Sequence, residues 1–331
     1  CSSDLARTLA WRGFQPKDGL ETSKREDFME RKSTWRQDFA RNKYKYLIFL
    51  PVTMYLLLFC YKPMYGAIIA FQKYRPALGI LKSQWVGFEN FENFFGDFYF
   101  ARTLRNTLLL SCYQLAWGFP LPILFALLLN ELKSPRFKRF VQTTSYLPHF
   151  ISLVVVCSLI KQFSLTKGLF NEIIAFFGGE RTPLLQYPNN FRTIYVASEV
   201  WQHFGWNSII YLAALTSIDP ALYEAAEIDG AGRLRRALHI TIPGLTSTIT
   251  MMLILNVGGI LSLGSEKVLL LYNQATYKTA DIISTYTYRK GLIESDFSFS
   301  TAVGLFNSAV NVCFLISANL LSKKVTDVGL F

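Results

Sequence analysis

The stretch that decides the fold is Asn106–Asn130, NTLLLSCYQLAWGFPLPILFALLLN, which carries no charged residue over 25 positions. A helix that crosses a hydrocarbon core of roughly 30 Å needs about 20 mostly apolar residues, so this stretch is long enough to span a membrane. Backbone groups in lipid must be paired internally, which favours an α-helix here. Pro120 and Pro122 lie inside the stretch, and neighbouring helices can absorb such breaks within a bundle.

Five further stretches repeat this pattern along the 331-residue chain. The chain is 51% hydrophobic and only 17% charged, against roughly 25% charged residues in an average soluble domain. Transmembrane β-strands would instead show ten-residue alternation. The sequence therefore predicts an all-α, polytopic membrane protein with six transmembrane helices. We expect these helices at 44–66, 104–130, 141–163, 191–217, 245–272 and 300–322.

The distribution of positive charge indicates the orientation. The chain has a net charge of +11, and nucleic-acid binding is one interpretation of such a basic chain. Positive-inside topology explains it better, because 20 of the 34 Lys and Arg residues fall in the segments 1–45, 131–139, 219–243 and 323–331. With these segments inside, both termini are cytoplasmic, the protein is a multi-pass component of the cytoplasmic (inner) membrane, and no nucleic acid is needed as a partner.

Four regions follow from these spans. Residues 1–43 form a basic cytoplasmic tail in which Phe28, Trp35 and Phe39 share a helical face, as in a helix lying on membrane lipid or in a solvated tail helix. Residues 44–66 are the first transmembrane helix. Residues 67–103 form a periplasmic segment, dense in aromatic residues, that suits an interface belt or a docking surface. Residues 104–331 form a five-helix core.

The segment 217–243, SIDPALYEAAEIDGAGRLRRALHITIP, connects two expected spans on the cytoplasmic side. Asp219 suits the N-cap of a helix, and Pro220 suits its first position. Gly230 can end this helix because glycine readily adopts a positive φ. A second short helix, from Arg233 to Ile240, should stop before Pro243. The pattern predicts a helix–turn–helix elbow.

The elbow resembles the EAA loop of binding-protein-dependent ABC importer permeases. That loop reads Glu-Ala-Ala, three residues, Gly, nine residues, Ile-x-Leu-Pro, and this chain departs from it only with Ile242 in place of Leu. Other stretches are similar to the sugar and oligosaccharide branch, which includes LplB-like and alginate-importer permeases. They are Pro63–Gly66, Val86–Asn90, Asn106–Leu108, Tyr146–Phe150 and Gly205–Ala214.

The resemblance implies a type I ABC importer permease fold and a division of labour among subunits. The loop would couple the chain to a separate ATPase dimer through Glu224, Ala225, Ala226, Gly230, Ile240 and Pro243. A Gly230→Pro or Gly230→Asp change should uncouple ATP hydrolysis from transport. A periplasmic solute-binding protein would deliver an oligo- or polysaccharide, including an acidic one such as alginate. A second, related permease subunit would complete a heterodimer.

No G-x-x-x-x-G-K-[ST] phosphate-binding motif occurs in the sequence. We therefore expect no enzymatic activity and no cofactor on this chain, with ATP and Mg²⁺ held by the partner ATPase. The five cysteines form no C-x-x-C pair and are interpreted as small apolar residues.

Polar residues within the spans are candidates for the substrate path, since charged groups inside a membrane commonly face a pore or a partner. Glu199 could line the path, pair with Arg192, or lie in interfacial water. Lys161, Arg192 and Lys267 lie near span ends and are interpreted as snorkelling side chains. The three histidines are far apart in sequence and predict no metal site. The path candidates, each with ordinary helix packing as its alternative, are Glu199, Trp201, His203, Trp206, Asn207, Asn256 and Asn307.

Three other classes of membrane protein fit this sequence less well. An ion-coupled secondary transporter should show inverted repeats and several carboxylates near the midplane, whereas Glu199 stands alone. An intramembrane enzyme should show paired Asp, a Ser/His pair or H-E-x-x-H at span depth, and none is present. A channel leaves the elbow at 217–243 unexplained. The ATP-driven importer remains the best interpretation.

Overall fold

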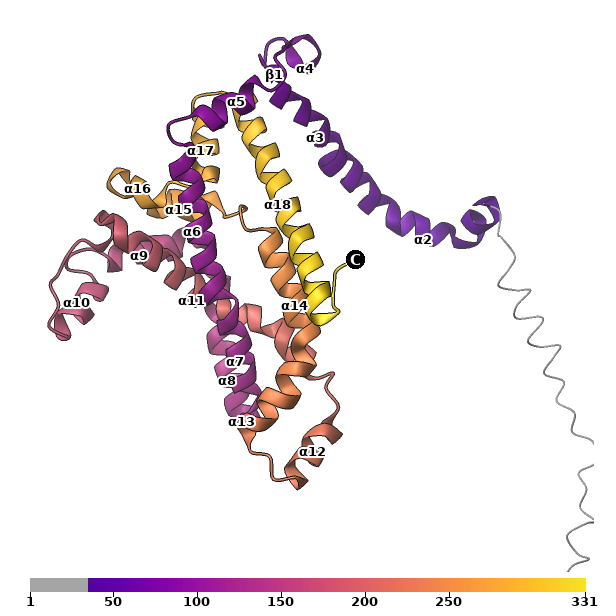
Figure 1. Ribbon diagram of the computed structural model, residues 1–331, viewed down its shortest axis with the longest axis vertical. Helices are drawn as coiled ribbons and strands as arrows, with labels where there is room; N and C mark the ends of the chain where they lie inside the picture. The colour runs from indigo at the N-terminus through magenta and orange to yellow at the C-terminus, as the bar shows by residue number, and fades with distance from the viewer. Residues whose placement is uncertain (1–34) are drawn as a thin grey trace, which may run out of the picture. The chain divides into compact units, whose positions relative to one another are not determined.

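The computed structural model describes residues 35–331 (Figure 1). The chain divides into two compact units, 1–65 and 66–331. The described part of the first unit is helical, with α2 (Trp35–Tyr55), the π-helical turn η1 (Leu56–Tyr61) and α3 (Lys62–Met64). Asn42 has non-helical dihedrals (φ −110°, ψ 18°) and kinks α2 near its start. The proposed interfacial helix of the tail lies largely outside the described residues and stays a prediction.

The second unit begins with the segment expected to be periplasmic. It contains η2 (Tyr65–Phe71), β1 (Gln72–Lys73), α4 (Gly79–Lys82), β2 (Gln84–Trp85) and α5 (Glu89–Gly96). The two strands pair antiparallel, with Gln72 opposite Trp85. In the described part of the chain this ribbon is the single exception to an otherwise all-α fold.

Aromatic rings hold this segment together. The Phe71 ring lies 5.7 Å from that of Trp85 and 5.4 Å from that of Phe91. Phe94 is fully buried and packs on Phe299 of the last helix. Phe94 is thus part of an internal core, whereas Trp85, Phe88 and Phe98 are exposed, so the belt or docking surface stays a prediction.

The remaining helices form the body of the second unit. They are α6 (Phe100–Gly118), α7 (Pro120–Asn130), α8 (Pro135–Tyr146), η3 (Leu147–Phe150), α9 (Leu153–Phe163), α10 (Leu169–Phe176), η4 (Leu184–Gln186), α11 (Pro188–Leu215), α12 (Pro220–Ile228), α13 (Arg233–Arg236), η5 (Ala237–Thr241), α14 (Ile242–Gly258), α15 (Ser265–Leu271), η6 (Gln274–Thr276), α16 (Tyr277–Ala280), α17 (Ile283–Tyr288), η7 (Arg289–Ile293) and α18 (Phe297–Thr326).

Among the described residues, four helices are long and apolar enough to cross a membrane, or five if one bent pair counts as a span. The four are Arg41–Phe71, Phe100–Asn130, Arg233–Gly258 and Phe297–Thr326. Helix α11 has 28 residues, which is sufficient length for a span, but its sequence is more polar. The all-α class is confirmed, whereas the number of six spans stays a prediction.

Two expected spans are broken. The third bends by 94° between η3 and α9, where Pro148 lacks a backbone N–H and Ile151 and Ser152 are extended. The fifth ends at Gly258 rather than running to 272, and irregular backbone follows up to Gly264. Three glycines within this seven-residue stretch weaken a helix through their backbone entropy.

Side chains from other helices satisfy the backbone at these breaks. Gln202 Nε2 donates to the Ile151 carbonyl at 3.2 Å. At the second break Ser111 Oγ donates to the Ile260 carbonyl, and the Leu261 amide donates to Asn311 Oδ1 at 3.1 Å. Irregular backbone is tolerated at membrane depth only where protein or water pairs it, so these side chains permit the breaks.

A buried carboxylate fixes one end of the body. Asp281 is fully buried, and its Oδ2 accepts hydrogen bonds from Arg102 at 3.0 Å and Arg289 at 2.8 Å. Thr285 Oγ1 donates to Asp281 Oδ1 at 3.0 Å. The start of α6 is thereby tied to the segment around α16, α17 and η7. The main apolar cluster lies close by and includes Leu110, Phe191, Val268, Leu271 and Ile282.

Helices α8 and α11 approach each other closely at Gly205. A Cβ added there would overlap the carbonyl oxygen of Ser145. Gly205→Ala should therefore destabilise the protein by about 1–3 kcal/mol through overpacking. The measurement is the thermal unfolding midpoint of the purified protein in detergent.

Gly304→Ala is the matched control, since Gly304 also lies within a helix but has no atom within 4 Å of its added Cβ. It should leave stability unchanged or raise it by up to about 1 kcal/mol. Equal unfolding midpoints for the two variants would contradict the close helix approach.

Candidate functional site

The elbow begins with a capped helix. Asp219 precedes α12, and its carboxylate accepts a hydrogen bond from the Ala221 amide at 2.9 Å. Pro220 occupies the first turn, where its missing N–H costs nothing. The predicted N-cap is confirmed. In Figure 1, α12 lies at the end of the second unit opposite α5 and α17.

The turn at Gly230 is a Schellman motif. Gly230 has φ +73°, its amide bonds the Glu227 carbonyl at 3.1 Å, and the Ala231 amide bonds the Ala226 carbonyl at 2.8 Å. These are the two hydrogen bonds that define the motif. The structure confirms that Gly230 ends the helix by adopting a left-handed conformation.

The second half of the elbow differs from the prediction. The helix that starts at Arg233 does not stop before Pro243 but continues to Gly258. The π-helical turn η5 precedes Pro243, and the Ile242 amide bonds the Ala237 carbonyl five residues back. This wider turn shifts the hydrogen-bond pattern just ahead of the proline, which has no amide to offer.

Two contacts join the halves of the elbow. The Tyr223 hydroxyl lies 3.0 Å from Thr241 Oγ1, and Arg236 Nη1 lies 3.0 Å from Glu227 Oε2. The first pair is partly buried and the second is exposed, so the tyrosine contributes more to stability. As a result α12 is fixed relative to η5 and to the long helix beyond it.

The structure places most of the predicted coupling residues at the surface. Glu224, Ala225, Gly230 and Pro243 are exposed, while Ala226 and Ile240 are half-buried. Four large apolar residues surround them and are also exposed, which the sequence analysis missed: Leu222, Ile228, Leu234 and Leu238. Their signal was the presence of large apolar side chains in a polar loop.

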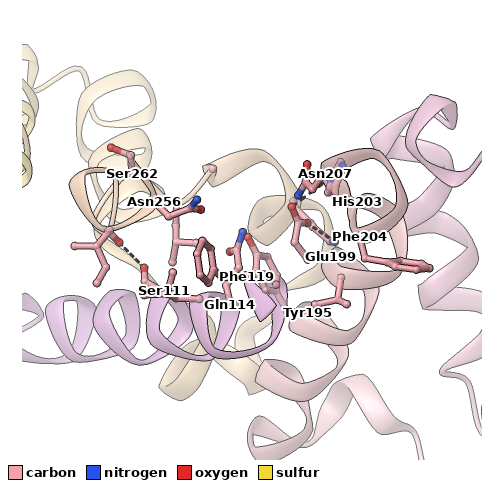
Figure 2. Close-up of a pocket in the computed structure, with 18 of the residues that line it drawn as sticks. Ser111, Gln114, Phe119, Tyr195, Glu199, His203, Phe204, Asn207, Asn256 and Ser262 are labelled. Carbon is pink, nitrogen blue, oxygen red and sulfur yellow. Dashed lines mark hydrogen bonds and ion pairs between the residues drawn. The ribbon is translucent and has the colours of Figure 1, made fainter. Parts of the chain in front are cut away.

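A second candidate site is a cavity of about 430 Å³ between α6, α11 and the irregular stretch after α14. Figure 2 shows Glu199, His203, Asn207 and Asn256 around it, together with Gln114 and Tyr195. Four of the seven predicted path residues therefore lie together. Trp206 lines an adjoining cavity of about 520 Å³ that shares Asn207 and Asn256.

The other two candidates lie elsewhere. Trp201 lines a third cavity, of about 690 Å³, with Trp117 and Arg192 on another face of α11. Asn307 lines none of these three cavities, and its Oδ1 atom is buried without a hydrogen-bond partner. The structure therefore does not bring Trp201 and Asn307 to the cavity around Glu199.

Glu199 pairs with Lys267 and His203 and not with Arg192, the partner that the sequence suggested. Lys267 Nζ lies 2.6 Å from Glu199 Oε2, and His203 Nε2 lies 3.4 Å from Glu199 Oε1. Arg192 instead donates to Asn106 Oδ1 at 2.8 Å. The Lys267 side chain is only 4% exposed, so the snorkelling interpretation is wrong for this residue. Its position on α15, beyond the unexpected break, directs it inward to Glu199.

Two histidines meet despite their separation in sequence. His149 Nδ1 lies 3.0 Å from His203 Nδ1, and the His149 ring stacks on Trp206 at 4.4 Å between centroids. The bend in the third span positions His149 here. Within residues 35–331, no group of three or more His, Cys, Asp or Glu side chains has the arrangement of a metal site.

The family model of the binding-protein-dependent transport system inner membrane component matches residues 101–327, which include both the elbow and the cavity. The chain belongs to this family of ABC transporter permeases. It is accordingly a multi-pass inner-membrane permease, and the ion-coupled transporter considered above is set aside.

Among similar proteins, this permease is 49% identical over 292 residues to the Bacillus subtilis polygalacturonan/rhamnogalacturonan transport system permease YteP, covering 88% of this chain and 91% of the relative. It is 44% identical over 299 residues to Bacillus subtilis LplB, covering 90% and 94%. The resemblance to the oligosaccharide branch is thus confirmed.

Solved structures agree. One is a chain of a bacterial alginate ABC transporter in complex with a periplasmic protein that holds an alginate pentasaccharide. It matches with a TM-score of 0.82 and 41% identity, covering 89% of this permease and 99% of that chain. Another belongs to a bacterial ABC transporter involved in import of the acidic polysaccharide alginate, with a TM-score of 0.80, 42% identity, and coverage of 87% and 98%.

The cap at Asp219 provides a test of the elbow's local structure. Asp219→Ala should destabilise α12 by about 1 kcal/mol, which corresponds to about fivefold faster amide exchange across residues 220–228. Hydrogen–deuterium exchange with mass spectrometry measures this. Asp229→Ala, at the other end of the same helix, is the control and should leave exchange nearly unchanged, because its side chain does not cap the first turn. Equal effects would contradict the capping role.

Proposed function

We propose that this permease forms one half of the translocation pathway of an ATP-driven importer for acidic oligosaccharides, coupled to a separate ATPase through the elbow at 217–243. The observation that carries the proposal is the exposed α12, which presents Glu224 and Ala225 beside Leu222 and Ile228. An apolar surface that carries the Glu224 carboxylate suits a groove on a protein partner that offers a basic or amide group.

The elbow is mechanically connected to the cavity. Tyr223 and Thr241 join α12 to η5, and the helix Arg233–Gly258 then runs without interruption past Asn256. Its 26 residues correspond to about 39 Å of helix. A displacement of α12 by a partner would therefore move the wall of the cavity. We take this helix as the route by which ATP hydrolysis changes access to the path.

The orientation of the membrane domain has support from an ion pair. Arg233 Nε lies 3.8 Å from Glu131 Oε2, which places the elbow beside the segment 131–139, the turn before α8 and the start of that helix. This segment holds four Lys and Arg residues in nine positions. Both segments then belong on the cytoplasmic side by the positive-inside rule, together with the N- and C-termini and the ATPase.

The remaining partners follow from the single elbow. One chain offers one docking elbow, so two ATPase subunits require a second permease, which we propose is a related chain in a heterodimer. A periplasmic solute-binding protein delivers the sugar on the opposite side, as the family's dependence on a binding protein indicates. ATP and Mg²⁺ belong to the ATPase subunits.

The solute class is proposed from two independent relatives. One is a permease for polygalacturonan and rhamnogalacturonan and another serves alginate, and these polymers all contain uronic acids. The cavity suits such a solute, because amides of Gln114, Asn207 and Asn256 can bond hydroxyl groups and Lys267 offers positive charge.

Gly230→Val tests the coupling role. Valine at φ +73° should cost about 1–2 kcal/mol of backbone strain, which would reduce the population of the docking conformation by about five- to thirtyfold. Uptake and solute-stimulated ATP hydrolysis by the assembled importer should both fall, and reconstituted vesicles measure both.

Gly232→Val is the matched control. Gly232 lies two residues away with φ −68° and has no atom within 4 Å of its added Cβ, so valine is tolerated there. Normal uptake and ATP hydrolysis in Gly230→Val, with the variant incorporated into the complex, would remove the elbow from the coupling mechanism.

A further inference from the structure

Lys267 is an unusual residue for its position. It lies on α15 within the membrane domain, its side chain is 4% exposed, and it lines the cavity around Glu199. Ionised groups inside a membrane are expensive and usually mark a functional position. Apart from Glu199, the Tyr195 ring supports the ammonium, with Nζ 5.3 Å from the ring centroid.

Glu199 uses its two carboxylate oxygens for different partners. Oε2 accepts from Lys267 at 2.6 Å, whereas Oε1 faces His203 at 3.4 Å. The Glu199 side chain is 21% exposed, more than that of Lys267. If another carboxylate approached Lys267 through the cavity, Glu199 could give up one partner and keep the other. When the pair opens, His203 therefore remains beside Glu199.

The rest of the cavity suits a sugar ring. Gln114, Asn207 and Asn256 supply amide groups, and Phe119 and Tyr195 supply aromatic surface. The Gln114 Oε1 atom is buried without a hydrogen-bond partner, so no other protein group uses this acceptor. A volume of about 430 Å³ falls within the usual range of small-molecule sites, about 300–1,000 Å³.

We infer that Lys267 is the specificity-determining residue that binds the carboxylate of an acidic sugar, and that Glu199 holds the Lys267 ammonium when no sugar is present. This inference rests on the proposed function. Exchange of one carboxylate for another keeps the Lys267 ammonium paired in both states, so this cation is never left as an uncompensated buried charge. A neutral sugar offers no such exchange and leaves the Lys267–Glu199 pair closed.

The test compares ligands that differ only in charge. The probes are oligogalacturonates and alginate oligosaccharides, each with its fully methyl-esterified form, which keeps the rings and removes the negative charge. The importer, purified with its ATPase, partner permease and binding protein, is reconstituted in vesicles. Stimulation of ATP hydrolysis is measured against the concentration of the sugar-loaded binding protein, so that transfer to the permease limits the response.

Three variants separate the roles of the two residues. Lys267→Met should raise the half-maximal concentration for the acidic probe about ten- to a hundredfold, because it removes a hydrogen bond to a charged group. The half-maximal concentration for the ester should be unchanged. Glu199→Gln, which removes the competing carboxylate, should strengthen the response to the acidic probe. The double variant Glu199→Gln/Lys267→Met has no charge at either of these two positions, so it should fold. Its half-maximal concentration should be the same for the acidic probe and for the ester.

The outcomes distinguish the inference from the proposed function. Suppose that wild type responds to the acidic probes, but that Lys267→Met and the double variant change the half-maximal concentrations for acid and ester by the same factor. The pair is then structural, and the inference is wrong. An acid-specific loss in the correctly assembled double variant supports the inference. If no saccharide stimulates wild type although its ATPase is assembled and active, the proposed solute class itself fails, and the inference with it.

Discussion

The cost of an unpaired backbone polar group in a membrane governs this structure. Where the chain continues as helix, as in most of Phe100–Asn130, the requirement is met by the helix's own hydrogen bonds. Where the chain breaks, a polar side chain from another helix pairs the exposed backbone, as Gln202 does at Ile151 and Asn311 at Leu261. Polar residues of the spans thus have two distinct uses, pairing backbone and lining cavities.

This distinction explains what the sequence could and could not predict. The elbow was predictable because its signals are local: Asp219, Pro220 and Gly230 each determine the conformation within a few residues. The helix continued through Pro243 because a π-helical turn formed just before it. A proline signals only the local loss of a donor, and how the preceding turn adjusts depends on packing.

The candidate site was harder to predict because its contacts are long-range. Glu199 and Lys267 are 68 positions apart, and the break between Gly258 and Gly264 turns Lys267 toward its partner. The three glycines of that stretch weaken a helix, but the stretch is apolar, and its hydropathy predicted a fifth span that continues to residue 272. The helix ends instead at Gly258. Pro148 similarly marked the bend that brings His149 to His203. In both places the local signal was visible, but its consequence depended on a distant residue.

The uninterrupted helix from Arg233 to Gly258 has a consequence for how the importer moves. With α12 fixed to its base through Tyr223, the helix connects the elbow directly to the cavity around Asn256. If this continuous helix bends little, a rotation at the elbow also rotates the end of the helix at the cavity. In the proposed importer, the approach of two ATPase subunits and the reshaping of the sugar cavity near Asn256 would then be a single motion rather than two successive ones.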